Sequence, residues 1–338
     1  MTRETTVLAS LNAGLSAALA ADDRVIVLGE DVLDPYGGAF KVTRGLSTRF
    51  PDRVLATPIS EAGIVAVATG AALRGLRPVV EIMFGDFLFL AGDQIVNHAA
   101  MYRAMFNDQV RVPLVIRTPA GGRRGYGPTH SQSLEKHFLG VPGLWVVAPH
   151  ALADPGALLR QAIDLDDPVL FVENKIDYGA QLATEPADYA AVRLADAASP
   201  FPTLWLAPRG PADGLLLCYG GMTGATLTAA ATLRATERLD LGLVIVSQLA
   251  PTPATHLEAI LAKGAPTAVV TVEEAPSEGG WGAEMIATIE RIRDSRRLGA
   301  IAYRRVGAKS APIPSARALE DAVLPQVDDI VAAVLDCF

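Results

Sequence analysis

Glu61 and His130 are the two residues of this sequence whose surroundings best suit chemistry. Glu61 is the one acid in residues 57–75, "TPISEAGIVAVATGAALRG", and no basic residue occurs there before Arg74. A carboxyl among apolar neighbours has a raised pKa, so it can share a proton with a ring nitrogen near neutral pH. The same position also suits the first turn of a helix, where the macrodipole favours an acid. Position alone leaves both interpretations open.

His130 lies in residues 121–135, "GGRRGYGPTHSQSLE", a Gly-rich polar stretch between a predicted strand and a short predicted helix. A loop of this kind can present an imidazole at the mouth of a site. Because imidazole titrates near neutrality, it can give or take a proton there. A lone histidine in a loop can equally be exposed and inert. No motif surrounds the other four histidines, His98, His137, His150 and His256.

The elements that must position these residues are short β-branched runs alternating with longer Ala- and Leu-rich segments. The runs are "RVIVLGED", "PVVEIMF", "VPLVIRTPA", "LWVVAP" and "PVLFVEN". This alternation predicts an α/β fold, a largely parallel sheet with helices on both faces. The pattern lapses over residues 177–213, which are rich in Pro, Ala and acids, and then resumes. We therefore predict two domains of this design, residues 1–195 and 205–338, the second ending in a helix after Pro325.

Composition limits the classes of function. The chain has 338 residues, of which 50% are hydrophobic and 20% charged, and a net charge of -8. This apolar composition suggests a surface covered by partner subunits, and scattered Lys and Arg argue against nucleic-acid binding. No apolar run reaches the roughly 18 residues of a membrane span. The first 20 residues lack the apolar core of an export signal, which predicts a cytoplasmic protein. Cys218 and Cys337 are too few for a disulfide framework or a zinc site.

Several motifs occur together in one order: "LGEDV", "YGGAFKVTRGL", "TPISEAG", "GLRPVVEIMFGDF", "DQIVN", "THSQSLE", "VPGLWVVAP" and "VEEAPSEGGWGAEM". Through them the sequence resembles the beta subunits of thiamine-diphosphate-dependent 2-oxo acid dehydrogenases. These subunits belong to the decarboxylating first components of the pyruvate and branched-chain complexes. The resemblance extends from residue 28 to residue 331. It implies a transketolase pyrimidine-binding domain followed by a transketolase C-terminal domain, whose role is mainly assembly.

The resemblance gives roles to five residues of the first domain. The family glutamate that matches Glu61 hydrogen-bonds the aminopyrimidine ring of thiamine diphosphate and promotes its imino tautomer, which removes the thiazolium proton. Phe87 matches the aromatic residue that stacks on this ring. Met83, Ile59 and Glu30 match positions that line or support the pocket. An isolated acid in an apolar setting suits this task, because a fully solvated carboxylate would hold the shared proton less well.

His130 matches the family histidine that assists proton transfer as the acyl group leaves for its acceptor. The two residues before "HSQS" are Pro128 and Thr129, whereas the family often has Ala-Gln there. Arg123 and Arg124 add positive charge to the same loop. The family's chemistry is expected to survive these differences. They put the choice of substrate and acceptor in doubt.

The resemblance also implies metal ions and a partner. Thiamine diphosphate binds with Mg²⁺, and related enzymes hold this ion through a "GDG" motif and a later Asn, which are oxygen ligands for a hard cation. The chain contains no "GDG". We therefore expect an alpha subunit to bring the diphosphate and magnesium half of the site, in an α2β2 heterotetramer. Some relatives hold a structural K⁺ through main-chain carbonyls at the positions of Leu114, Ala162, Leu165 and Asp167.

Three functions remain open. The first is the beta half of a 2-oxo acid dehydrogenase, which decarboxylates its substrate and passes the acyl group to a lipoyl domain. The second is a repurposed relative that moves a two-carbon unit from a ketose or oxo acid to an acyl carrier protein. The third is a non-catalytic scaffold, which would not need Glu61, Phe87 and His130 together. Single-chain transketolase and deoxyxylulose phosphate synthase are disfavoured, because both carry the diphosphate half in the same chain.

Overall fold

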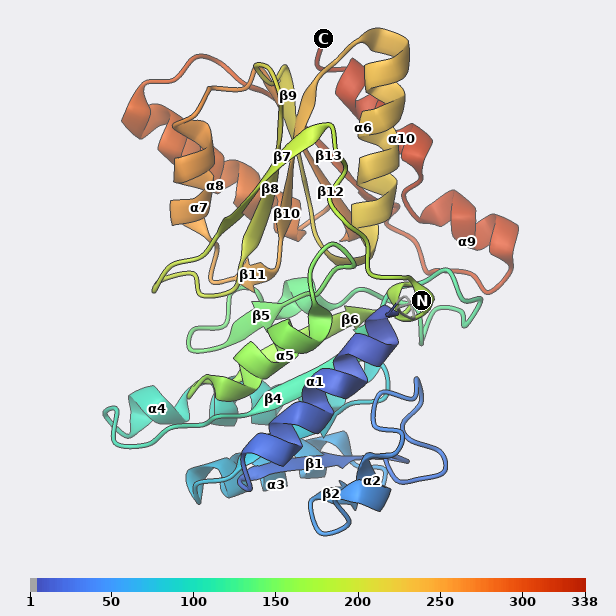
Figure 1. Cartoon of the computed structure of the whole chain (residues 1–338), viewed down its shortest axis with the longest axis vertical. Coiled ribbons are helices and arrows are strands. Elements are labelled where there is room, and N and C mark those ends of the chain that lie inside the picture. Colours follow the sequence, from blue (N-terminus) through green and yellow to red (C-terminus); the bar gives the residue numbers. More distant parts are fainter. Residues whose placement is uncertain (1–4) are drawn as a thin grey trace. The chain divides into compact units, whose positions relative to one another are not determined.

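The computed structural model describes residues 5–338, which form two compact units (Figure 1). The first unit takes the chain up to residue 120 and then residues 137–183. The second unit takes residues 121–136 and 184–338. The chain therefore leaves the first unit for one loop, returns to it, and then builds the second unit.

The first unit is built on a parallel sheet whose strands follow the order β5-β6-β4-β3-β1-β2. β1 and β4 are buried along their whole length. Strands that are buried along their whole length form where both faces of a sheet are covered. The strands are β1 (Val25–Gly29), β2 (Val54–Ala56), β3 (Arg77–Glu81), β4 (Val115–Ala120), β5 (Trp145–Val147) and β6 (Val169–Asn174).

Helices α1 (Val7–Ala21) and α5 (Pro155–Asp164) lie side by side across this sheet (Figure 1). Their contact is close, because a Cβ at Gly14 would lie 2.4 Å from the carbonyl oxygen of Gly156. α3 (Glu61–Leu73) packs on β3 and β1. The shorter helical segments are α2 (Leu46–Arg49), η1 (Gly85–Ala91), η2 (Gln94–Ala99), α4 (Tyr102–Met105), η3 (Glu135–Phe138) and η4 (Asp177–Gly179).

The second unit has a mixed sheet with the strand order β13-β12-β9-β10-β8-β7. The first four strands are parallel, and β8 and β7 continue the sheet in antiparallel pairs. α6 and α10 cover one face, and α7 and α8 the other (Figure 1). The strands are β7 (Tyr189–Leu194), β8 (Thr203–Pro208), β9 (Gly214–Cys218), β10 (Leu241–Val246), β11 (Gln248–Ala250), β12 (Ala268–Pro276) and β13 (Ala302–Ala308). The helices are η5 (Gly220–Met222), α6 (Thr223–Glu237), α7 (Ala254–Leu261), α8 (Trp281–Arg296), α9 (Arg317–Val323) and α10 (Val327–Leu335).

The predicted fold class is confirmed, since both units are largely parallel sheets with helices on both faces. Two details differ from the prediction. β7 and β8 lie inside residues 177–213, where the strand pattern had seemed to lapse, because the prolines near β8 stand at its ends and leave its interior free to pair. The loop 121–136 belongs to the second unit, although it lies within the predicted first domain.

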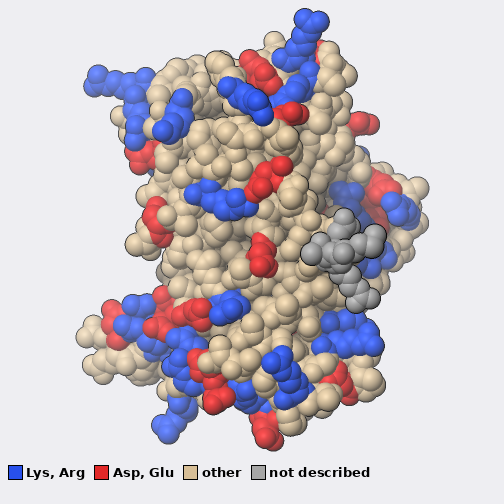
Figure 2. Space-filling model, viewed as in Figure 1, with Lys and Arg blue, Asp and Glu red and all other residues tan. Residues whose placement is uncertain are grey.

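Charged side chains of both signs are interspersed over the face shown in Figure 2, with no large area of one sign. This pattern is typical of a solvated surface and differs from the basic stripe that binds a nucleic-acid backbone. Among the helices of residues 5–338, none combines the length and the apolar character that a membrane span requires.

Candidate active site

Five predicted site residues follow the ends of three neighbouring parallel strands. Glu30 comes directly after β1, Ile59 and Glu61 come shortly after β2, and Met83 and Phe87 come after β3. These strands are adjacent in the order β3-β1-β2. The carboxyl ends of parallel strands meet at one edge of a sheet, and ligands of open α/β sheets bind there. The structure therefore brings the five residues to one edge of the first unit.

The two acids of this group are both buried. Glu61 is the first residue of α3 and is 6% exposed, and Glu30 is 8% exposed. Burial raises the pKa of Glu30 above its usual range, and the negative charges of Glu61 and Asp31 raise this pKa further. Neighbouring acids of which one favours its neutral form are suited to holding and passing a proton.

Phe87 belongs to a row of aromatic rings. It lies in η1, half-buried, and its ring meets the ring of Phe84 edge-on with centroids 5.9 Å apart. Phe84 meets Phe40 edge-on at 5.7 Å, and Phe40 stacks on Tyr178 at 5.1 Å. Met83, also half-buried, precedes this row. The packed rings limit the movement of Phe87, so this ring can offer a fixed surface to a flat ligand.

Ile59 is 84% exposed, unlike the two acids. Monomeric proteins rarely leave large apolar surfaces open to water, so an exposed group of large apolar side chains indicates a surface for another molecule. The first unit exposes several such side chains: Ile59, Val67, Phe89, Leu90, Met105 and Phe106.

A buried ion network lies among the neighbouring strands. The Arg117 guanidinium of β4 donates to both carboxylate oxygens of Glu173 (2.7 Å each) and to Oε2 of Glu81 (2.9 Å). The Tyr178 hydroxyl donates to Glu173 (2.7 Å). Burial alone would lower the pKa of Arg117, but the charges of Glu173 and Glu81 outweigh burial and raise this pKa well above its usual value. The network therefore joins three strands to the aromatic row that ends at Phe87.

Sequence reasoning missed this network, although a sign of it was present. The runs "PVVEIMF", "VPLVIRTPA" and "PVLFVEN" are mostly apolar, and each carries one charged residue. A buried charge is costly unless it is paired. Opposite single charges in neighbouring covered strands therefore predict a buried ion pair.

Replacing Arg117 by lysine tests whether the network stabilises the first unit. Lysine keeps the positive charge but cannot bond both carboxylates with one planar group. We expect the free energy of unfolding, measured by urea denaturation, to fall by about 2 kcal/mol. Arg304→Lys is the control, because Arg304 forms an exposed ion pair with Asp336 (3.8 Å), and exposed pairs contribute little. An equal loss in both variants would contradict the role given to the network.

His130 lies in the second unit, whereas the five residues above lie in the first. Its Nδ1 is 3.0 Å from Oγ1 of Thr129, and its backbone N–H donates to the carbonyl of Gly127 (3.3 Å). The imidazole is partly exposed. A hydroxyl can donate to this ring nitrogen or accept a hydrogen bond from it, so the contact with Thr129 is compatible with either tautomer of the imidazole.

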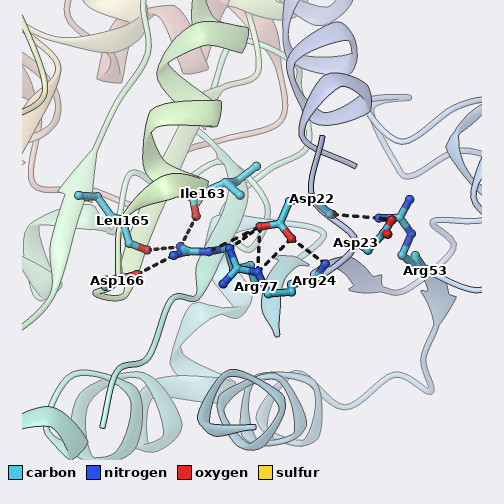
Figure 3. Close-up of polar contacts among 8 residues, drawn as sticks. All are labelled: Asp22, Asp23, Arg24, Arg53, Arg77, Ile163, Leu165 and Asp166. Carbon is cyan, nitrogen blue, oxygen red and sulfur yellow. Dashed lines mark hydrogen bonds and ion pairs between the residues drawn. The ribbon is translucent and has the colours of Figure 1, made fainter. Parts of the chain in front are cut away.

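The residues predicted to hold K⁺ surround the end of α5 and the start of β4. The Arg77 guanidinium donates there to the carbonyls of Ile163 (2.8 Å) and Leu165 (2.9 Å) and to the carboxylate of Asp166 (2.6 Å) (Figure 3). The carbonyl of Leu114 accepts a backbone N–H from β6 (2.8 Å). A carbonyl oxygen has two lone pairs, so these hydrogen bonds neither require nor identify an ion. A potassium ion on Leu114, Ala162, Leu165 and Asp167 stays a prediction.

Comparison with known proteins identifies the family. Residues 4–181 match the family "Transketolase, pyrimidine binding domain", and residues 206–330 match "Transketolase, C-terminal domain". The chain is 36% identical over 332 residues to the mitochondrial pyruvate dehydrogenase E1 component subunit beta-2 of Oryza sativa subsp. japonica, covering 98% of this chain and 85% of that protein. The chain belongs to the family of E1 component beta subunits. The resemblance expected from the motifs is thereby confirmed.

Two further similarities show the breadth of this family and its fold. The chain is 34% identical over 345 residues to the beta subunit of an acetoin:2,6-dichlorophenolindophenol oxidoreductase from Cupriavidus necator, covering 98% of this chain and 97% of that protein. Beta subunits with differently named substrates are thus similar to this chain. A solved structure titled "Split gene transketolase, inactive beta4 tetramer" has a TM-score of 0.71 at 20% identity, with 98% of each chain covered. This last similarity supports the fold.

Proposed function

We propose that this E1 beta subunit family member is the beta half of a thiamine-diphosphate-dependent 2-oxo acid dehydrogenase, which decarboxylates a 2-oxo acid and passes the acyl group to a lipoyl domain. The observation that carries the proposal is Glu61, a buried acid at the carboxyl edge of a parallel sheet beside a second acid with a raised pKa. Relatives named as pyruvate dehydrogenase beta subunits support the reaction class.

The residues present suit the pyrimidine half of thiamine diphosphate. Glu61 would hold a proton shared with a ring nitrogen, and Phe87 would pack against the flat face of the ring. Met83 and Ile59 would add apolar contacts. The raised pKa of Glu30 favours its neutral form, because a second buried carboxylate beside Glu61 is disfavoured by charge repulsion. When bound, the cofactor supplies the carbon nucleophile and delocalises the electrons released by decarboxylation.

The remaining half of the site is proposed to come from an alpha subunit. The sequence has no "GDG" motif for Mg²⁺. Within residues 5–338 there is no group of three or more His, Cys, Asp or Glu side chains that could hold a metal ion. The exposed side chain of Ile59 and the other exposed apolar residues of the first unit fit a surface that the alpha subunit covers. K⁺ on the carbonyls near α5 is a further proposal, and no step of the reaction depends on it.

An acyl carrier protein is a second candidate acceptor. The observation that favours it is the Pro128–Thr129 sequence before His130, with the Thr129 hydroxyl beside the imidazole. An assembled complex distinguishes the two candidates when it is supplied with either a lipoyl domain or an acyl carrier protein. The carrier protein is added together with an artificial two-electron acceptor, because its thiol, unlike the lipoyl disulfide, cannot take up the two electrons released when the acyl thioester forms. Acylation of the lipoyl domain alone supports the main proposal, and acylation of the carrier protein alone replaces it.

Calorimetric titration tests the sharing of the cofactor site. Thiamine diphosphate and Mg²⁺ are titrated into the chain alone and into its mixture with the alpha subunit. We expect no tight binding to the chain alone, because it lacks the motif that holds Mg²⁺ and the diphosphate. Binding to the mixture is expected to be tight and to disappear when Mg²⁺ is omitted. Tight, magnesium-dependent binding by the chain alone would refute the shared site.

A further inference from the structure

We propose that Glu274 and Glu320 are positioning residues, which hold the loop 121–136 and thereby set the place of His130. We call these two side chains the glutamate clamp. The second unit would then contribute to the reaction as well as to assembly. The catalytic part of this inference rests on the proposed function, whereas the holding of the loop does not.

The clamp acts on the backbone of the loop. The N–H of Gly122 donates to Oε1 of Glu274 (2.6 Å). The N–H of Arg123 donates to Oε1 of Glu320 (2.7 Å), and the N–H of Gly125 donates to Oε2 of the same carboxylate (3.2 Å). Glu274 lies in β12 and Glu320 in α9, and both are buried. Hydrogen bonds to ionised groups are roughly twice as strong as neutral ones, so three of them tie this loop firmly.

The loop has the backbone shape that such binding requires. Gly121, Arg123, Gly125 and Gly127 all have positive φ, between 67° and 87°. Where residues in left-handed conformation alternate with residues in right-handed conformation, successive backbone N–H groups point toward one concave side of the loop. Such a concave side binds anions. In this chain the concave side receives the Glu320 carboxylate. The positive φ values that this shape requires explain the Gly-rich sequence.

The surroundings leave the loop little freedom to shift. A Cβ at Gly122 would lie 2.6 Å from Cδ1 of Leu324 and 3.1 Å from Oε1 of Glu320. The guanidinium of Arg123 donates to the carbonyl of Pro325 (2.6 Å), just after α9. The start of the loop is thus enclosed by the side chain of Glu320 and by the turn between α9 and α10.

The other end of the loop is anchored as well. The N–H of Gly121 donates to the carbonyl of Gln132 (3.1 Å), which closes the loop on itself. Glu135 accepts a hydrogen bond from the hydroxyl of Tyr219 (2.5 Å), and the ammonium of Lys136 donates to the carbonyl of Glu278 (2.9 Å). His130 therefore lies between two anchored ends.

A fixed loop matters because proton transfer needs hydrogen-bond reach. A misplacement of about 1 Å can reduce a rate by about a hundredfold. Loss of the clamp would let His130 occupy many positions, of which few could serve an acyl acceptor. Decarboxylation without that acceptor would not need the loop in one place.

Limited trypsin digestion of the full chain tests the holding of the loop. Arg123 and Arg124 offer two cleavage points, which mass spectrometry identifies. With Glu320→Ala we expect cleavage there to be about ten- to a hundredfold faster, as follows from losing two hydrogen bonds to a buried charge. With Glu320→Gln the increase is expected to be smaller, because its amide oxygen still accepts the Arg123 N–H. Cleavage of both variants at the wild-type rate would overturn the proposal.

The matched control is Glu273→Gln. Glu273 is also a buried glutamate of β12 that accepts two backbone N–H groups, those of Trp281 and Gly282 (2.9 Å each). These groups belong to α8, outside the loop. We expect this variant to keep the wild-type cleavage rate after Arg123 and Arg124. Faster cleavage in the control equal to that in Glu320→Gln would mean that general loosening explains the result, and would overturn the clamp.

Rates in the assembled complex test the catalytic part. With Glu320→Gln we expect acyl transfer to fall by about tenfold, while decarboxylation with an artificial electron acceptor stays near wild type. In a His130→Ala background, Glu320→Gln should cause no further loss, because both changes act through the same imidazole. Additive losses would contradict positioning. If the wild-type complex transfers no acyl group, the proposed function fails, and the digestion result still decides whether the clamp holds the loop.

Discussion

Replacing Glu61 by glutamine is expected to slow hydrogen exchange at the thiazolium carbon of thiamine diphosphate by about a hundredfold or more in the assembled complex. Glutamine keeps the shape of the side chain but has no acidic proton to share. Positioned acids and bases contribute about 10² to 10⁴ in rate. Glu61 is buried at the start of α3, so water is poorly placed to substitute for it. Quenched deuterium exchange followed by NMR measures the rate.

Asp154→Asn is the control for this variant. Asp154 caps α5 in the same unit by accepting the N–H groups of Gly156 and Ala157. Its replacement also removes a carboxylate from a helix N-terminus, and it is expected to lower stability without changing the exchange rate. If Glu61→Gln leaves the exchange rate unchanged, Glu61 has no role in cofactor activation. It would then retain only its effect on the helix dipole, which is about 0.3 to 1 kcal/mol.

The arrangement of the candidate site could be predicted because its residues follow strands. Glu30, Glu61 and Phe87 each come after a run that is apolar and rich in β-branched residues, and such runs form parallel strands in this pattern. Parallel strands share one carboxyl edge, so their following residues gather there. The motifs and the strand pattern therefore place the same residues in the candidate site. The roles of these residues in catalysis stay predictions.

The surroundings of these residues could not be predicted in the same way. Arg117 bonds Glu81 and Glu173, which are 36 and 56 residues away along the chain, and no local pattern specifies such pairs. Ile59 is 84% exposed in this chain, and the sequence does not indicate that exposure, because it depends on what covers the chain. β7 and β8 were missed because their pairing with each other and with β10 outweighs weak local propensity.

The loop 121–136 is the clearest case of contacts that the local sequence does not indicate. In sequence it continues the first domain, yet it packs with the second unit. The partners that hold its backbone, Glu274 and Glu320, are 152 and 197 residues away from Gly122 and Arg123. A glycine-rich composition indicates a loop, but it does not indicate where that loop is held. The two anchored ends of the loop are therefore visible only in the structure.

Replacing His130 by alanine is expected to slow acyl transfer much more than decarboxylation. In an assembled complex, decarboxylation measured with an artificial electron acceptor should persist at a substantial fraction of the wild-type rate. Transfer to a lipoyl domain or a carrier protein should fall by about a hundredfold, the usual range for removing one general acid or base. The reason is that the bound cofactor would itself delocalise the electrons released by decarboxylation, whereas the departing thiolate of the acceptor needs a proton that the protein must place.

The quantity to compare between variant and wild type is the ratio of the acyl-transfer rate to the decarboxylation rate. A loss of assembled complex lowers both rates together and leaves this ratio unchanged. His98→Ala is the matched control: it removes a partly exposed imidazole that lies in the first unit, 3.9 Å from the carboxylate of Asp93, and it is expected to leave the ratio unchanged. An equal loss of both activities in His130→Ala would mean that His130 serves an earlier step than transfer.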